Sequence, residues 1–120
     1  MVGELLKSKT PLALALYRRF EHLALGLEGS VLASARTRIG FQRRRIFAAV
    51  NAIRDDRLDI HIVTSEPIRS TRIRRVEKLA RTCHVNHFSV RSLVELDDEV
   101  PEWLRQGYEW DVGEAGDSCG

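Results

Sequence analysis

Hydrophobic residues recur at helical spacing in the first part of the chain, over residues 12–27. The apolar stripe consists of Leu12, Leu16, Phe20, Leu23 and Leu27. Pro11 suits the first turn of a helix, and Gly29 suits the position just beyond its end. Because other apolar residues lie off this stripe, the pattern predicts a helix that is buried on more than one side or that offers a second face to a partner.

After Gly29 the pattern changes to one typical of strands. Residues 31–42 alternate between two sets of side chains, which predicts one strand, and residues 58–64 and 83–91 alternate in the same way. Residues 46–53 are apolar at both even and odd positions, as in a strand that is covered on both faces, although a helical interpretation of this run also stands. The charged runs 43–45 and 54–57 predict turns.

A short helix is predicted for residues 71–80, since Ile73, Val76 and Ala80 have helical spacing after Ser70 or Thr71 as a cap. The last helix has a clearer start, because Ser92 and Glu95 form a capping-box pattern. We expect that helix to run to about Trp110.

Pro101 interrupts the pattern of the last helix. A proline in a helix interior removes one hydrogen bond and forces a kink or a restart. We therefore expect a break near residues 98–102.

Together these elements predict a single α+β domain over residues 1–110. It would contain an antiparallel sheet of about four strands, with the N- and C-terminal helices packed on one face. Residues 111–120 are polar and are expected to form a disordered tail. A chain of 120 residues can bury a core of ordinary size without disulfides or metal ions.

The remaining composition adds expectations about location. No apolar run approaches the length of about 20 residues that a membrane-spanning helix needs, and the first residues do not look like a signal peptide. A cytoplasmic protein without membrane contact is expected. Cys83 is expected to be a small buried hydrophobe in a strand, and a bridge to Cys119 is not expected.

Charged residues are unevenly distributed along the chain. The formal net charge of +2 conceals a balance of +10 over residues 1–92 and of −8 over residues 93–120. Almost all of the basic residues are arginine, whose guanidinium group can bind phosphate or carboxylate through two parallel hydrogen bonds. The bias indicates recognition of an anion, although a genome whose codon usage favours arginine gives the same composition.

The stretch from Arg36 to Arg91 carries 14 Lys and Arg against 5 Asp and Glu. If its arginines gather on one surface, they can contact several phosphates of a nucleic acid or hold a phosphorylated small ligand. The candidate anion-binding residues are Arg36, Arg38, Arg43, Arg45, Arg72, Arg74 and Arg75. Two alternatives stay open: the arginines pair with the acidic last helix, or a few of them bind a small anion in a pocket on the open sheet face.

Candidate chemistry of another kind is sparse. Asp59, His61 and His87 form a candidate pocket if their strands pair in the right register, and two histidines with a carboxylate can hold a divalent metal ion. The sequence lacks His-Glu-x-x-His, Cys-x-x-Cys, Gly-x-Ser-x-Gly and phosphate-loop motifs. We therefore expect no metal ion, no cofactor and no catalytic residues.

Several stretches, taken in order, resemble one known family. They are Leu16–Phe20, Thr37–Phe41 followed by Phe47-Ala48, Arg72–Glu77, Cys83–His87, Leu96–Glu99, Trp103–Arg105 and Tyr108-Glu109. Over about residues 4–110 the chain is similar to a family of small bacterial domains of unknown function, domain of unknown function number 5655. The resemblance implies one domain and names no activity. Asn86 stands where relatives often have a histidine, which further disfavours a histidine metal site.

Three functional hypotheses follow. The first is a non-catalytic binding module whose basic surface holds a nucleic acid or a phosphorylated small ligand. The alternative is a protein-interaction or homo-oligomerisation domain, for instance a homodimer, that uses the first and last helices. The third is a small metal-dependent hydrolase, and the residues considered for it are Asp59, His61, Cys83, His84 and His87.

Overall fold

The computed structural model describes residues 6–113, which form an α+β fold with one antiparallel sheet. Within these residues the sheet has six strands in the order β1-β2-β3-β4-β6-β5. The strands are β1 (Val31–Ser34), β2 (Ile39–Gln42), β3 (Ile46–Ile53), β4 (Leu58–Thr64), β5 (Arg75–Ala80) and β6 (Cys83–Val90). The helices are α2 (Pro11–Leu25), α3 (Leu93–Asp97) and α4 (Val100–Val112).

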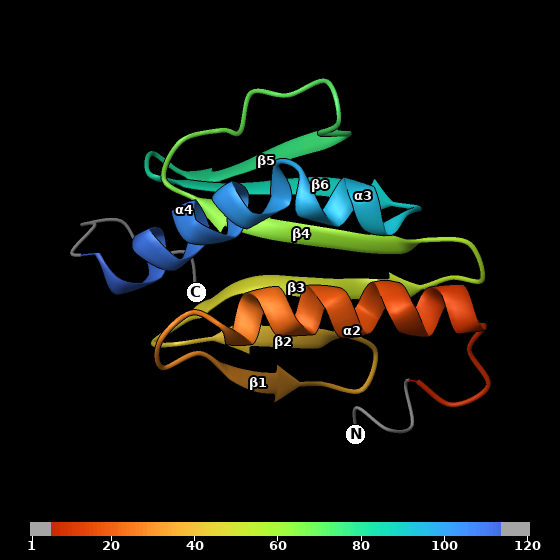
Figure 1. Ribbon diagram of the computed structural model, residues 1–120. Coiled ribbons are helices and arrows are strands. Elements are labelled where there is room, and N and C mark those ends of the chain that lie inside the picture. The colour runs from red at the N-terminus through yellow and green to blue at the C-terminus, as the bar shows by residue number, and fades with distance from the viewer. Residues whose placement is uncertain (1–5, 114–120) are drawn as a thin grey trace.

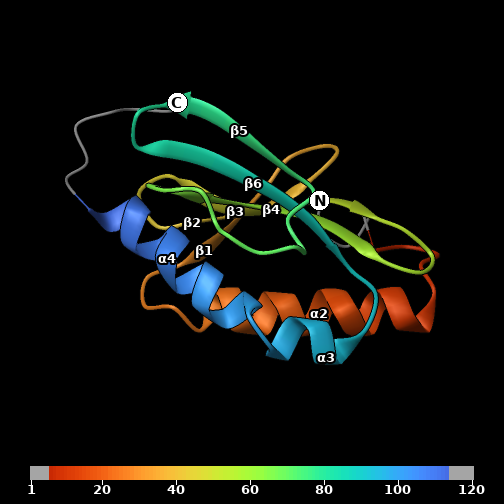
Figure 2. The ribbon, with the colours of Figure 1, turned by 90° about the horizontal axis from the view of Figure 1, so that it is seen from above.

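The three helices of residues 6–113 lie on the same face of the sheet, as Figure 1 shows, with α2 across one half and α3 and α4 across the other. Seen from above, the helices form one layer and the sheet forms the other (Figure 2). Aromatic rings join the two layers: Phe20 of α2 meets Phe41 of β2, and Phe88 of β6 meets Trp103 of α4. The predicted α+β class and the placement of the helices are confirmed.

The predicted number of about four strands is wrong, because two segments differ from the prediction. Residues 31–42 are not one strand but the hairpin of β1 and β2, in which Ser34 pairs with Ile39. The alternation runs unbroken through the turn between them, and no glycine, proline or asparagine marks that turn. The pattern alone therefore could not show that the chain reverses there.

The predicted short helix at residues 71–80 is also wrong. Residues 71–72 form a turn, and β5 follows as an edge strand that pairs with β6 on one side. Five of the six residues of β5 are exposed to solvent. An edge strand that is solvated on both faces has no alternation of apolar residues, so the chance spacing of Ile73, Val76 and Ala80 resembled a helix.

The C-terminal helical region follows the prediction more closely. The Ser92 N–H donates to Glu95 Oε1 over 3.0 Å at the start of α3, as the capping-box pattern predicted. The helix breaks after Asp97 and restarts at Val100, so Pro101 stands in the first turn of α4, where a missing N–H costs little. The helix ends at Val112, so its last residues lie beyond the end of the predicted domain.

Gly107 sets how closely α4 approaches the sheet. A Cβ atom at this position would lie 2.8 Å from Cγ2 of Ile62 and 3.1 Å from the Val63 carbonyl oxygen. No larger residue fits without moving the helix, so the glycine allows α4 to pack directly on β3 and β4.

Cys83 is fully buried, as expected, and it is disulfide-bonded, which was not expected. Cys119 lies outside the described residues, and so does most of the predicted tail. Among residues 6–113, none of the helices has the length and apolar character that a membrane crossing needs.

Candidate functional site on the open face of the sheet

The sheet face that points away from the helices brings the predicted pocket residues together. Antiparallel pairing of β4 with β6 places His61 opposite His87 and Asp59 opposite Ser89. Because side chains alternate along a strand, Asp59, His61 and Val63 all point to this face. The two imidazole rings have centroids 5.6 Å apart. The prediction that Asp59, His61 and His87 share one face agrees with this register.

A cavity of about 670 Å³ lies on this open face. Its lining divides into three groups. The cationic group is Arg38, Arg44 and Arg45; the other polar residues are Asn51, His61, Glu77 and His87; the apolar group includes Ile46, Val63, Leu79, Val85 and Trp110. A concave surface that combines apolar area with a few convergent polar groups is typical of sites for small organic ligands.

The histidines of the cavity are held by different partners. Nδ1 of His61 lies 2.9 Å from Nδ2 of Asn51, which shares this face because Ala49, two residues earlier on β3, pairs with His61. Nε2 of His87 lies 2.6 Å from Oε1 of Glu77 on β5. The hydrogen bond from His87, aided by the nearby Arg75, lowers the pKa of the Glu77 carboxyl, so Glu77 is the acidic member of this group.

His61 is buried, with 8% of its surface exposed, and its surroundings disfavour a proton on the ring. Burial is the largest cause that lowers the pKa of His61 from 6.5 to about 4, and repulsion from His87 and Arg38 adds to it. The negative charge of Glu77 acts in the opposite direction. At neutral pH the centre of the cavity is therefore an uncharged imidazole beside an amide.

This shift predicts how stability depends on pH. As pH falls from 6.5 to 4.5, His61 gains a proton in the unfolded chain but stays neutral in the folded one, so acid favours the unfolded state. We expect His61 to account for a loss of about 2 kcal/mol in the free energy of unfolding over this range. Urea titrations at several pH values should show this loss in the wild type and not in His61→Gln. If the free energy of unfolding depended on pH in the same way in both proteins, the buried, neutral state of His61 would be contradicted.

The arginine wall of the cavity is fixed by a carboxylate from α4. Three successive backbone N–H groups, those of Arg43, Arg44 and Arg45, donate to the side chain of Asp111, with distances of 2.8, 3.1 and 2.6 Å to its nearer oxygens. The Asp111 side chain is completely buried. Backbone N–H groups that converge in this way form an anion-binding nest, and here the protein's own carboxylate fills it.

The predicted anion-binding arginines divide among four places. Arg38 and Arg45 line the large cavity, and Arg74 and Arg75 line a neighbouring hollow. Arg43 donates to the Tyr108 hydroxyl and the Glu28 carbonyl, and Arg72 donates to the Glu95 carbonyl. Arg36 is exposed in the turn between β1 and β2 and lines neither space.

Two of the predicted anion-binding arginines are engaged within the fold. Arg43 and Arg72 pack against the C-terminal helices, as internal pairing requires, and Arg72 also lies 3.9 Å from Glu99. In contrast, the Arg38 and Arg44 side chains form no hydrogen bond or ion pair with another residue in the range 6–113. Their charges at the cavity remain available to a ligand.

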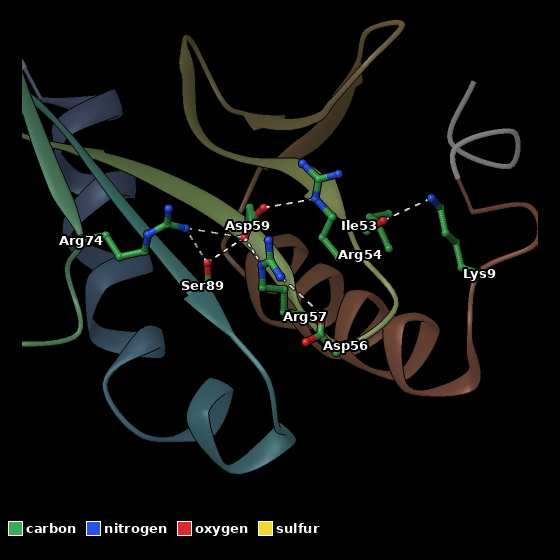
Figure 3. A network of polar contacts seen from close by, with 8 residues as sticks. All are labelled: Lys9, Ile53, Arg54, Asp56, Arg57, Asp59, Arg74 and Ser89. Atoms are coloured by element: carbon green, nitrogen blue, oxygen red, sulfur yellow. Dashed lines mark hydrogen bonds and ion pairs between the residues drawn. The ribbon is translucent and has the colours of Figure 1, made fainter.

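Asp59 lies at the centre of a separate cluster, which Figure 3 shows from close by. Its carboxylate accepts a hydrogen bond of 2.7 Å from Ser89 and one of 3.1 Å from Arg57, and it lies 3.6 Å from Arg54 and 3.8 Å from Arg74. Burial opposes ionisation of Asp59, but the hydrogen bonds from Ser89 and Arg57 and the nearby charges lower its pKa overall. Asp59 is thus an anion that is already paired.

The other candidate residues point elsewhere. His84 lies on the opposite face of β6 from His87 and is within 3.1 Å of the Ser65 carbonyl oxygen. Asn86 shares that face, so a histidine at its position would not join His61 and His87. In the part of the chain that the structure describes, no group of three or more histidine, cysteine or acidic side chains is arranged to hold a metal ion.

Sequence patterns missed several residues of the site, namely Asn51, Glu77, Trp110 and Asp111. Asn51 stands in a run that is otherwise apolar, and Glu77 lies in the segment that the pattern predicts to be a helix. Trp110 supports Arg45, whose guanidinium lies 3.8 Å from the indole ring centroid. Arg44 belongs to the charged run 43–45, which predicts only a turn, and its place in the cavity follows from the fold.

Comparison with known proteins identifies the kind of domain. Residues 2–111 match the model of a family described as Domain of unknown function (DUF5655). No curated protein and no solved structure matches the chain.

Proposed function

Since the chain belongs to the DUF5655 family, whose function is unknown, we propose a function from the cavity: non-catalytic binding of a small organic anion, such as a phosphorylated ligand. The observation that carries this proposal is the presence of Arg38 and Arg44, unpaired within residues 6–113, at the wall of a cavity with apolar lining. A guanidinium group beside a cavity binds phosphate or carboxylate through charge-assisted hydrogen bonds.

The size and charge of the cavity support this choice. Its volume of about 670 Å³ lies within the range of small-molecule sites. Three arginines face one acidic residue, Glu77, and Glu77 is engaged by His87. The apolar lining would contact the body of the ligand, while Arg38 and Arg44, which border the cavity from opposite ends of β2, would attract its anionic group.

Nucleic acid is a less suitable partner for this surface. A single strand is usually held by a row of cations interleaved with aromatic rings on which bases stack. Among phenylalanine, tyrosine and tryptophan side chains of the described structure, Trp110 alone lines the large cavity, and its ring is already covered by Arg45. Arg43 and Arg72 are engaged with the helical layer and do not extend a row of phosphate contacts.

Substitutions at Arg38 and Arg36 test the proposal, because the two arginines lie two positions apart in the same hairpin and only Arg38 lines the cavity. With phenyl phosphate as the probe, we expect Arg38→Gln to weaken binding about tenfold in titration calorimetry, through loss of one charge-assisted contact. Arg36→Gln, the matched control, should bind like the wild type.

A short single-stranded DNA serves as the competing probe. Equal losses in the two variants, with affinity that falls steeply as salt rises, would instead support an extended nucleic-acid surface. Absence of phenyl phosphate binding to the wild type at low salt would refute the proposed function.

The alternative of a protein-interaction or homo-oligomerisation domain has a specific observation in its favour. The helical layer exposes large apolar side chains, among them Leu12 on α2 and Leu93 and Val94 on α3, and Val94 is 76% exposed. Exposed apolar groups of this kind occur at interfaces between proteins. Light scattering at increasing protein concentration tests the homo-oligomer, because a strict monomer excludes it.

A further inference from the structure

A hollow of about 210 Å³ lies at the end of the sheet where β3 extends past β2. The pairing of β2 with β3 begins at Ile39 and Val50, so residues 51–53 have no partner in β2. The space beside them is bordered by the turn before β2, by the turn after β3 and by the segment before α2. These three segments contribute Arg38, Arg54 and Lys9 to the lining.

The charges around this hollow are all of one sign. Lys9, Arg38 and Arg54 line it, and none of its lining residues in the described structure is acidic. Asp55 and Asp56 follow Arg54 in the chain but do not line the hollow. Cations that gather in this way repel one another, and an anion bound between them would relieve the repulsion.

Each of the three cations keeps hydrogen-bond donors for a ligand. The Lys9 ammonium has three N–H groups, of which one donates to the Ile53 carbonyl over 3.1 Å. The Arg38 side chain has no hydrogen bond or ion pair with another residue of the range 6–113. Nε of Arg54 lies 3.6 Å from the Asp59 carboxylate, and Figure 3 shows that its two terminal nitrogens point away from that carboxylate.

The carboxylate of Asp59 offsets the charge of Arg54 only in part. It accepts hydrogen bonds from Ser89 and Arg57, and it also lies 3.8 Å from Arg74. One negative charge therefore faces three guanidinium groups. The side chain of Arg54 is also 58% exposed, so a ligand can reach it from solvent.

The hollow adjoins the large cavity, since Arg38 and Asn51 line both spaces. Its volume is below the value of about 300 Å³ at which sites for whole small molecules begin, so it suits one charged group. The large cavity offers apolar surface to the rest of a ligand, and its acidic residue Glu77 disfavours an anionic group there.

We propose that this hollow binds the anionic group of the ligand, a phosphoryl dianion, through Lys9, Arg38 and Arg54. The organic body of the ligand then extends past Asn51 into the large cavity. This inference rests on the proposed function and deepens it, because it gives the phosphoryl group a position and assigns ligand contacts to Lys9 and Arg54. A dianion is preferred to a monoanion because three cations surround the group.

Phenyl phosphate and phenyl sulfate test this inference, because both carry a tetrahedral group on the same ring. At about pH 8 the phosphate ester has nearly two negative charges, and the sulfate ester has one. In titration calorimetry we expect the wild type to bind the phosphate ester about tenfold more tightly than the sulfate ester. Lys9→Gln and Arg54→Gln should each weaken the binding of phenyl phosphate about tenfold.

Matched controls separate the hollow from a general effect of charge. Lys7→Gln and Arg69→Gln remove exposed cations that line none of the spaces described above, and both variants should bind like the wild type. Lys9→Arg keeps a cation at the hollow and should retain most of the affinity. Thermal unfolding of Lys9→Gln verifies that this variant folds without the hydrogen bond to the Ile53 carbonyl.

The outcomes distinguish this inference from the proposed function. If phenyl phosphate binds and Arg38→Gln weakens it while Lys9→Gln and Arg54→Gln do not, the position of the phosphoryl group is wrong and the proposed function stands. Equal affinity of the wild type for the two esters would overturn the preference for a dianion. If inorganic phosphate binds through Lys9 and Arg54 but phenyl phosphate does not bind, the anion site stands and the proposed function is wrong. Absence of binding by either phosphate would overturn both.

Discussion

Replacing Asp111 with alanine is expected to lower the free energy of unfolding by about 4 kcal/mol, the largest effect of any substitution considered. Its buried carboxylate accepts hydrogen bonds from the backbone N–H groups of Arg43, Arg44 and Arg45. Alanine would remove the acceptor that three convergent donors share, and of these only the Arg43 N–H has another contact, of 3.3 Å to the Arg45 carbonyl oxygen. The measurement is urea denaturation followed by tryptophan fluorescence.

Two controls make the Asp111 prediction specific. Asp111→Asn keeps one oxygen that can accept from two of the three N–H groups but turns an amide NH₂ toward the third, so its loss should be smaller than that of alanine. Asp98→Ala removes an exposed carboxylate between α3 and α4 and should change the free energy of unfolding by less than about 0.5 kcal/mol. A loss below about 1 kcal/mol for Asp111→Ala would contradict the role given to the nest.

Replacing Asn86 with alanine is expected to cost about 3 kcal/mol. The side chain is fully buried, and its amide joins three parts of the chain. Oδ1 accepts from the Ile68 N–H over 2.9 Å, while Nδ2 donates to the Ile62 carbonyl and the Thr64 hydroxyl, each over 2.9 Å. Alanine would remove these hydrogen bonds and leave a small cavity, although the Thr64 hydroxyl would keep its bond to the Glu66 carbonyl.

A second substitution tests how much the NH₂ group of the Asn86 amide contributes to stability. Asn86→Asp replaces Nδ2 with an oxygen that faces the Ile62 carbonyl, so it should destabilise at least as much as alanine at neutral pH. Asn51→Ala is the matched control, because this asparagine is only partly buried and has His61 as its partner. Similar losses for Asn51→Ala and Asn86→Ala would refute the interpretation.

The strands of the centre of the sheet could be predicted from the sequence. Residues 46–53 and 58–64 coincide with β3 and β4, because a buried strand needs apolar side chains at regular positions. The edges could not be predicted in this way. The strands β1 and β5 are largely exposed, so burial does not impose a pattern on their residues.

The candidate site was predictable only as a set of residue types. Asp59, His61 and His87 could be placed on one face if the register allowed it, but register depends on pairing between strands that are distant in sequence. The pattern also does not predict the place of each arginine: Arg43 and Arg44 are adjacent, yet the Arg43 side chain donates to Tyr108 while Arg44 lines the cavity. Asp111 gave no signal because the groups that bind it are backbone atoms, which every residue carries.

The strand order has a consequence for the integrity of the cavity. The strands β1 to β4 form a meander, and β5 and β6 form a separate hairpin that joins it through the pairing of β6 with β4. His61 stands on one side of this junction and His87 on the other. Each unit can form from local contacts, but the cavity exists only while the hairpin is docked. A ligand in the cavity would bridge two cooperative folding units, so its binding energy would oppose their separation and suppress partial opening of the sheet.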